Sequence, residues 1–375
     1  MRYPKANRIL LVAVPGFGDV LVATPILRAL RTVYPNAVLD MMVRQGSESI
    51  LMDHPDVSNV IPVPRRPSIR AMLQLLAKRF RRYDLAVSTS ITDRAFFNCI
   101  MAAPERVSLV QPLRFKNFWK HAGIQNRVAY DPSIHVVERH LRLCDALDIP
   151  RSYEIIPPLN PNAARILDKE LDFNWRTEPI AVIHMFPASR HKRWPKKNWQ
   201  ILIQALRDKG MRIVLTGGST PDEKLEAQQM KQSCGDLVHE AAGRIPFSTL
   251  TLLLSTAVLY VGPDTGTTHL AAATGTPCIA LFGPSNPVNW SPWPKGYRGE
   301  APPFTAHDRF QINQNVAVIC ATCHCNPPKN TCLDPGYSGL PCLASIRPEE
   351  VLLAVDDLIG TYAAGNQPPT GTKLA

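Results

Sequence analysis

The chain has 375 residues, of which 45% are apolar and 19% are charged. This composition is that of a folded globular protein, and the length favours two domains. No apolar run approaches the roughly 20 residues of a membrane-spanning helix, and the best candidate, residues 250–261, is short and contains Thr251, Ser255 and Thr256. The basic N-terminus resembles a signal peptide only until Pro15 and two glycines interrupt it, so we expect a cytoplasmic protein.

Short β-branched runs alternate with helical patterns along the chain. In the first half, residues 8–14, 37–43 and 83–88 are expected strands, and residues 20–34 are an expected helix. In the second half, four further strands are expected at residues 180–184, 211–216, 258–262 and 278–282. Alternating strands and helices predict parallel sheets covered on both faces, an α/β doubly wound fold.

A segment rich in Pro, Asn and Asp, residues 155–178, separates the two series of strands. We therefore expect two Rossmann-like domains, residues 1–165 and 178–362, followed by a disordered tail at residues 363–375. Ligands of such domains bind at the carboxyl ends of the strands, here in a cleft between the domains.

The first expected strand ends in a glycine turn that carries one carboxylate. Gly16 and Gly18 form half of a dinucleotide-binding motif, but Leu21 occupies the place of its third glycine, which argues against a nicotinamide cofactor. Asp19 is then either a helix N-cap or a general base held at a strand end. Because Pro25 cannot donate to the Leu21 carbonyl, the turn should be irregular, which favours a functional role.

A basic stretch occupies residues 61–82. It has no acidic residue and seven basic ones, Arg65, Arg66, Arg70, Lys78, Arg79, Arg81 and Arg82. It is either a solvated helix face or a surface for anionic lipid or a phosphorylated acceptor. No nucleic-acid-binding motif accompanies the net charge of +11, so nucleic acid is not an expected partner.

A basic loop follows the strand expected at residues 180–184. It runs from Ala188 through Ser189 and Lys192 to Pro195, and its charges suit a diphosphate leaving group. A solvated basic loop is the alternative interpretation. Trp194 and Pro195 are expected to fix the loop.

A third stretch joins a strand to a helix through small residues: Gly262, Pro263, Asp264, Thr265, Gly266 and, one turn later, His269. Free N–H groups and the helix dipole make such a helix start an anion site, with His269 close to it. The turn at residues 281–287 and Gly217 at another strand end should lie at the same edge. Asp222 and Glu223 follow that glycine and compete as ligands of a ribose.

Five cysteines lie near the C-terminus, at Cys320, Cys323, Cys325, Cys332 and Cys342. Their spacing matches no standard zinc module, so the assignment is no metal site, with a structural zinc as the alternative.

Taken together, these motifs resemble those of glycosyltransferase family 9, the heptosyltransferases of lipopolysaccharide core assembly. The resemblance extends to about residue 350 and rests on three elements: Gly18-Asp19-Val20 with Thr24-Pro25, Lys192 to Pro195, and Asp264-Thr265-Gly266 with His269. Other stretches, such as residues 34–37, 135–139 and 289–293, are most similar to the heptosyltransferase III branch.

The resemblance implies a GT-B fold, two Rossmann-like domains facing across a cleft, and an inverting transfer from ADP-L-glycero-D-manno-heptose to the lipopolysaccharide inner core. It implies that Asp19 is the general base, that Lys192 binds the donor diphosphate, and that Asp264, Thr265, Gly266 and His269 line the donor site. Glu223 would bind the ribose, and no cofactor is required.

The implied partners are an ADP-sugar, a lipid A-linked acceptor and, by peripheral contact, the inner membrane surface. The alternatives are a GT-B enzyme that uses another nucleotide sugar, including an epimerase, and a non-catalytic basic protein that binds the envelope or nucleic acid.

Overall fold

The computed structural model describes residues 1–14, 16–64, 77, 80–299, 301–306, 308–322 and 342–363. The chain divides into two compact units, Met1–Pro158 and Leu159–Ala375. The expected first domain ran to residue 165, but α7 (Ala163–Glu170) packs against α10 (Phe247–Thr256) of the second unit. The expected tail lies outside the described residues from position 364 onward.

The first unit is built on a parallel sheet of six strands in the order β3-β2-β1-β4-β5-β6. These strands are β1 (Arg8–Ala13), β2 (Val38–Arg44), β3 (Asn59–Val63), β4 (Leu85–Ser88), β5 (Glu105–Val110) and β6 (Asn126–Ala129). The helices are α1 (Phe17–Leu21), α2 (Thr24–Val33), α4 (Asp93–Ala102), α5 (Phe118–Gly123) and α6 (Val136–Leu147), with 3-10 turns η1 (Glu48–Ile50) and η2 (Phe115–Asn117).

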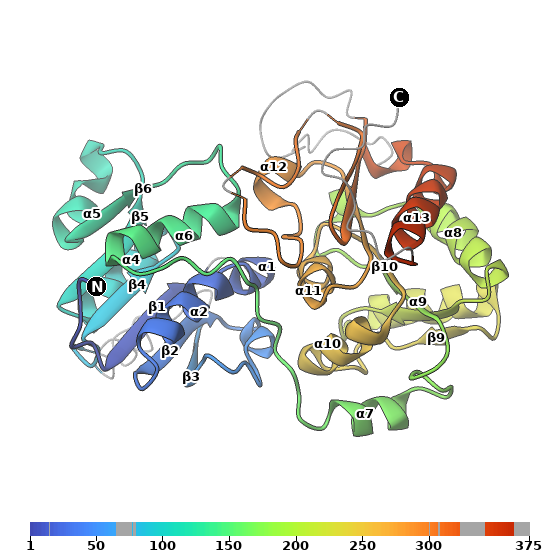
Figure 1. Ribbon diagram of the computed structural model, residues 1–375, viewed down its shortest axis with the longest axis horizontal. Helices are drawn as coiled ribbons and strands as arrows, with labels where there is room; N and C mark the ends of the chain where they lie inside the picture. The colour runs from blue at the N-terminus through green and yellow to red at the C-terminus, as the bar shows by residue number, and fades with distance from the viewer. Residues whose placement is uncertain are drawn as a thin grey trace. The chain divides into compact units, whose positions relative to one another are not determined.

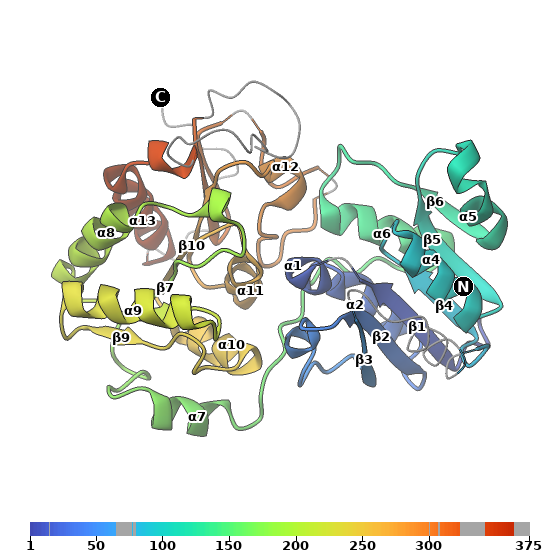
Figure 2. The same cartoon turned by 180° about the vertical axis from the view of Figure 1, so that it is seen from behind.

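Both faces of this first sheet are covered by helices. Leu10 and Val12 of β1 pack with Phe96 and Cys99 of α4, on one face. On the other face α2 packs against α6, and α6 contacts β5 and β6. Figure 1 views the unit from the side of α2 and α6, and Figure 2 from behind.

The second unit repeats this strand order over five strands, from β9 to β11, and adds two strands beyond them. Its sheet runs β12-β13-β11-β10-β7-β8-β9, in which β12 alone is antiparallel among the described strands. The strands are β7 (Ile180–His184), β8 (Arg212–Thr216), β9 (Val238–Glu240), β10 (Leu259–Pro263), β11 (Cys278–Phe282), β12 (Phe310–Asn313) and β13 (Val316–Cys320). The remaining helical elements are α8 (Lys196–Asp208), α9 (Pro221–Cys234), α11 (Gly266–Thr274), α12 (Pro287–Trp290), α13 (Pro348–Ala363), η3 (Arg190–Lys192) and η4 (Cys342–Ser345).

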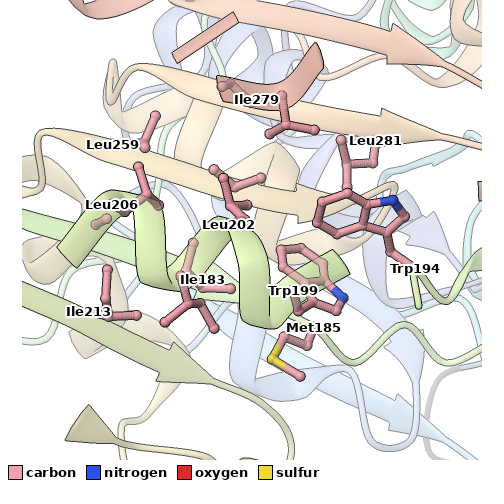
Figure 3. Packing of buried hydrophobic residues seen from close by; sticks show 14 of the residues in the cluster. Ile183, Met185, Trp194, Trp199, Leu202, Leu206, Ile213, Leu259, Ile279 and Leu281 are labelled. Atoms are coloured by element: carbon pink, nitrogen blue, oxygen red, sulfur yellow. The ribbon is translucent and has the colours of Figure 1, made fainter. Parts of the chain in front are cut away.

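One large apolar cluster holds α8, α9 and α13 against one face of the second sheet. Figure 3 shows Leu202 and Leu206 of α8 among side chains of the strands, including Ile183 and Leu259. On the opposite face α11 packs against β10 and β11 and also contacts α10.

Both sheets therefore have the order typical of Rossmann folds, and each has a point where the order reverses. In the first unit this point lies between β1 and β4, and in the second between β7 and β10. Loops that follow these four strands are the places where a ligand is expected. Asp19 follows β1, Lys192 follows β7, and Asp264 follows β10.

No helix among the described residues combines the length and the apolar character that a membrane crossing requires.

Candidate functional site

Lys192 and Asp264 meet at the reversal point of the second sheet. Lys192 Nζ lies 2.5 Å from Asp264 Oδ2 and 3.4 Å from the carbonyl oxygen of Asp264. The Asp264 side chain is 10% exposed, whereas that of Lys192 is 28% exposed. An ammonium group has three N–H donors, so Lys192 retains donor capacity toward a ligand while the aspartate fixes its position.

The loop that carries Lys192 is anchored by a buried tryptophan. Trp194 Nε1 donates to the Ile346 carbonyl at 2.9 Å, and its ring meets that of Trp199 edge to face at 4.8 Å. Figure 3 shows the two rings side by side, with Leu281 of β11 close to Trp194. The expectation that Trp194 fixes this loop is therefore confirmed. Two residues before this anchor, the short η3 turn ends at Lys192.

Helix α11 begins directly after Asp264. Thr265 is its N-cap residue and Gly266 its first residue. The Thr268 hydroxyl is tied to the Tyr260 hydroxyl at 2.9 Å and to the Thr265 hydroxyl at 3.1 Å, which holds the first turn in place. The first N–H groups of any helix have no acceptor within the helix, and the dipole adds positive potential there. The helix start beside Lys192 is thus an anion-binding arrangement.

His269 is buried one turn into α11. Its Nε2 lies 3.9 Å from Asp264 Oδ1, too far for a hydrogen bond, and its Nδ1 has no partner in the described part of the chain. Burial lowers the pKa of His269, although the Asp264 carboxylate acts in the opposite direction. A neutral imidazole with unused nitrogens is available to hydrogen-bond a ligand held at Lys192 and the helix start.

The structure of the loop after β8 shows which of Glu223 and Asp222 is the better candidate for a ribose ligand. Thr220 caps α9 by accepting from the Glu223 N–H at 3.4 Å, and Asp222 points into solvent as an exposed side chain. Glu223 is half-buried, and its Oε2 is buried without a partner in the described structure. A Cβ on Gly218 would lie 2.5 Å from this oxygen, so the carboxylate lies directly over the glycine backbone. Glu223 is therefore the better candidate to bind a hydroxyl ligand.

Two candidate residues of the loops, Gly217 and Ser189, have roles in the local structure that explain their presence. A Cβ on Gly217 would lie 2.7 Å from the Phe186 ring, so a glycine there lets the strand end pack closely. Ser189 accepts the Lys192 N–H through its carbonyl oxygen at 3.1 Å, which shapes the η3 turn.

In the first unit, Asp19 is the third residue of α1 and not its N-cap. The N-cap is Gly16, which has an extended backbone and no side chain to cap with. The Asp19 carboxylate reaches back toward the Gly16 N–H, and a Cβ on Gly16 would lie 2.5 Å from Asp19 Oδ2. Gly16 is therefore required because the carboxylate occupies the space of a side chain at that position.

Burial raises the pKa of Asp19. The N–H groups of Asp19 and Gly16 and the charges of Arg44 and Arg139 oppose this shift without cancelling it. Arg139 is itself buried, and it donates to the Tyr130 hydroxyl at 2.6 Å. A half-buried carboxylate with a raised pKa at a strand end is a candidate general base.

The expected helix at residues 20–34 is interrupted where Pro25 predicted an irregularity. Helix α1 ends at Leu21 and α2 begins at Thr24. The Thr24 hydroxyl donates to the Leu21 carbonyl at 2.7 Å, which is the acceptor that Pro25 cannot serve. Within the same break, His140 Nδ1 of α6 lies 3.2 Å from the Val22 carbonyl oxygen. The break ends the short helix that carries Asp19, and its carbonyl groups remain hydrogen-bonded.

Comparison with known proteins gives the family of this chain. The sequence model of "Glycosyltransferase family 9 (heptosyltransferase)" matches residues 74–312, more than half of the chain. The chain belongs to glycosyltransferase family 9. Asp19 precedes the matched residues, whereas Lys192 and residues 264–269 lie within them.

Two curated relatives of this glycosyltransferase place it among heptosyltransferases. It is 28% identical over 287 residues to lipopolysaccharide heptosyltransferase 3 of Escherichia coli, a match that covers 74% of this chain and 82% of the relative. It is 27% identical over 334 residues to lipopolysaccharide heptosyltransferase 1 of Pseudomonas aeruginosa, covering 84% and 86% respectively. The predicted similarity to the heptosyltransferase III branch is confirmed by the first of these.

Solved structures establish the fold as GT-B. The family 9 glycosyl transferase of Veillonella parvula superimposes with a TM-score of 0.73 at 17% identity, covering 96% of this chain and 98% of that one. Escherichia coli ADP-heptose lps heptosyltransferase II gives a TM-score of 0.69 at 20% identity, covering 95% and 99%.

No sequence pattern connects Arg44 and Arg139 of this glycosyltransferase with Asp19. They act on its carboxylate from β2 and α6, and Arg139 is 120 positions away along the chain. The signal that could have identified Arg139 is a basic residue within the apolar pattern of α6. Its burial appears only in the structure.

The cysteine-rich segment lies largely outside the described residues, which include only Cys320 and Cys342 of the five cysteines. Burial raises the pKa of the Cys320 thiol to about 12. Within the described ranges, His, Cys, Asp and Glu side chains form no group of three that could hold a metal ion. Of the basic stretch at residues 61–82, Arg81 and Arg82 are described, and both are exposed.

Proposed function

We propose that this family 9 enzyme transfers a heptose from ADP-L-glycero-D-manno-heptose to a sugar hydroxyl of the lipopolysaccharide inner core, with inversion at the anomeric carbon. The observation that carries the proposal is the anion-binding arrangement of Lys192, Asp264 and the start of α11 at one reversal point. Relatives named lipopolysaccharide heptosyltransferase support the sugar and the acceptor. A solved Escherichia coli heptosyltransferase, WaaC, was obtained with ADP, which supports the nucleotide.

The second unit would bind the donor. The diphosphate would accept hydrogen bonds from Lys192 Nζ and from the first N–H groups of α11, while Asp264 holds the lysine in place. Glu223 would accept hydrogen bonds from the ribose hydroxyl groups through Oε2, which is buried without a partner among the described residues. The neutral His269 would donate a hydrogen bond near the diphosphate, so its role does not depend on carrying a charge.

The first unit would supply the base. As the acceptor oxygen bonds to the anomeric carbon, its proton passes to the Asp19 carboxylate, and the bond from that carbon to the diphosphate oxygen breaks. The leaving ADP gains negative charge, which Lys192 and the helix start would stabilise. Attack from the face opposite the leaving group inverts the configuration. The acceptor is attached to lipid, so we also propose peripheral contact with the membrane surface.

The proposed function is tested by offering the protein a panel of nucleotide sugars with truncated lipopolysaccharide acceptors and weighing the products by mass spectrometry. We expect a mass increase of one heptose, with ADP-heptose as donor and none with UDP-sugars. Addition of a different sugar, or release of an epimerised nucleotide sugar without transfer, would contradict the proposal.

A further inference from the structure

Exposed apolar side chains gather in the connection between β5 and β6. Phe115 is 93% exposed, Leu113 65% and Phe118 59%. Phe115 and Phe118 lie with their ring centroids 6.2 Å apart. We call residues 113–118 the aromatic turn. Isolated exposed apolar residues are ordinary, but three within six positions form a patch that needs an explanation.

The aromatic turn is anchored by the side chain of Asn117 and by the two residues that follow the turn. Asn117 is buried; its Oδ1 accepts the Arg114 N–H at 2.6 Å, and its Nδ2 donates to the Pro112 carbonyl at 2.9 Å. The two residues after the aromatic turn pack inward: Trp119 meets Phe96 of α4 edge to face, and Lys120 donates to the Ile91 carbonyl at 3.0 Å. The two phenylalanines are thus presented outward by a turn that the hydrogen bonds of Asn117 and the inward packing of Trp119 and Lys120 anchor.

The chain segment that contains the aromatic turn carries charges of one sign. From residue 106 to residue 130 the chain has no acidic residue, and it contains Arg106, Arg114, Lys116, Lys120, His121 and Arg127. Arg114 and Lys116 alternate with the apolar residues and are themselves exposed. Lys120 is paired with Asp93 at 2.5 Å, so its charge is already compensated. Aromatic rings flanked by exposed cations match the boundary between the head groups and acyl chains of an anionic bilayer.

The position of the aromatic turn suits a lipid-linked acceptor. It follows the carboxyl end of β5, in the same parallel sheet and at the same edge as the loop between β1 and Asp19. The contact of Lys120 with Ile91, which follows β4, also places the start of α5 at that edge. In Figures 1 and 2, α5 lies at the β5–β6 end of the unit, away from β3.

We propose that the aromatic turn is a membrane-docking surface that inserts Leu113, Phe115 and Phe118 into an anionic bilayer while Arg114 and Lys116 bind lipid phosphates. As an account of how the acceptor is reached, this rests on the proposed lipid-linked substrate. The docking itself is testable without any substrate.

The test is co-sedimentation of the full chain with vesicles, without nucleotide or acceptor. Phosphatidylglycerol–phosphatidylcholine vesicles should bind the protein, and pure phosphatidylcholine vesicles should bind it much less. Replacing Leu113 and Phe115 together with Asn should weaken binding to the anionic vesicles by about tenfold or more, because buried apolar area is lost. Arg114→Gln with Lys116→Gln should weaken binding at low salt, with little effect at high salt.

Leu353→Asn is the matched control, since Leu353 is 63% exposed on α13 of the second unit. It should leave vesicle binding unchanged, and thermal unfolding should show that all variants fold. Equal vesicle binding by the wild type and the Leu113/Phe115 variant would overturn the proposal. So would light scattering that shows a wild-type dimer converted to a monomer by the same variant, since the surface would then join two copies of the chain.

Turnover separates this proposal from the proposed function. The Leu113/Phe115 variant should lose activity on a vesicle-embedded acceptor and keep it on a deacylated, water-soluble acceptor. If the variant and the wild type are equally active on both acceptors, the docking proposal is overturned and the proposed function stands. Absence of wild-type turnover on both acceptors contradicts the proposed function, while the vesicle binding still decides the docking.

Discussion

Asp19 combines two features that usually exclude each other in a helix's first turn. A carboxylate at the third helical position normally satisfies an N–H group and has a lowered pKa. The Asp19 carboxylate makes such a contact with Gly16, yet burial raises its pKa above the ordinary value. The residue is therefore poorly explained as a cap alone.

The raised pKa has a defined consequence for stability. A carboxyl group whose pKa is higher in the folded than in the unfolded state favours folding as pH falls through the folded pKa, and its ionised form costs stability at neutral pH. Asp19→Asn removes that cost and can still bond to the Gly16 N–H. We expect the thermal midpoint at pH 7 to be unchanged or higher, measured by calorimetry. A clear drop would mean that Asp19 mainly supports the fold.

At the scale of the element, the break between α1 and α2 depends on one hydroxyl. Thr24→Val keeps the shape but removes the donor to the Leu21 carbonyl, which then lies buried without that partner. We expect a loss of about 1–2 kcal/mol in the free energy of unfolding. Turnover should fall too, because α1 positions Asp19. Thr24→Ser keeps the hydroxyl and is the control; equal loss in both variants would contradict this explanation.

The anchoring of the Lys192 loop by Trp194 can be tested in the same way. Trp194→Phe removes the hydrogen bond to the Ile346 carbonyl and should weaken ADP binding, because the loop that holds Lys192 loses its anchor. Trp199→Phe is a matched control, since Trp199 is equally buried and its Nε1 has no partner among the described residues. Isothermal calorimetry with ADP should show a several-fold weaker affinity for Trp194→Phe, about 1 kcal/mol, and little change for Trp199→Phe. The reverse order would contradict the anchoring role.

Much of this fold could be predicted from the sequence, because strands and helices alternate and have distinct periodicities. The strands at residues 180–184 and 278–282 were expected with the bounds that the structure has. The strands β3, β5, β6, β9, β12 and β13 were missed, and their length is not the reason, because β5 has six residues whereas the four-residue β4 was predicted. Motif positions at strand ends predicted that Lys192 and Asp264 would share an edge. Their pairing, and the influence of Arg139 on Asp19, depend on tertiary packing that no local pattern records.

At the scale of the whole molecule, the chain contains two units whose sheets share one strand order over five strands. Each unit buries histidines in the neutral form. Burial lowers the pKa of His140 in the first unit to about 3, and that of His184 in the second unit to about 4. Their unfolded values lie near 6.5, so the unfolded state binds more protons as the pH falls from about 6.5 toward 4.

Both units should therefore lose stability over this range. We expect each such histidine to contribute up to about 1.4 kcal/mol per pH unit in the acidic part of the range. Denaturant unfolding at pH 7 and pH 5, followed for each unit by hydrogen exchange, measures the effect. His140→Gln should reduce the pH dependence in the first unit and leave the second unchanged. Equal stability at the two pH values would contradict the assignment of buried neutral histidines.

The central claim is a division of labour, in which Asp19 of the first unit is the base and Lys192 of the second binds the donor diphosphate. The most direct measurement compares Asp19→Asn and Lys192→Ala by calorimetry with ADP and by steady-state rates. Asp19→Asn should lower turnover about 100-fold or more with ADP affinity unchanged, because no phosphate contact is lost. Lys192→Ala should weaken ADP binding as well as turnover. An active Asp19→Asn enzyme, or ADP binding unaffected by Lys192→Ala, would contradict the account.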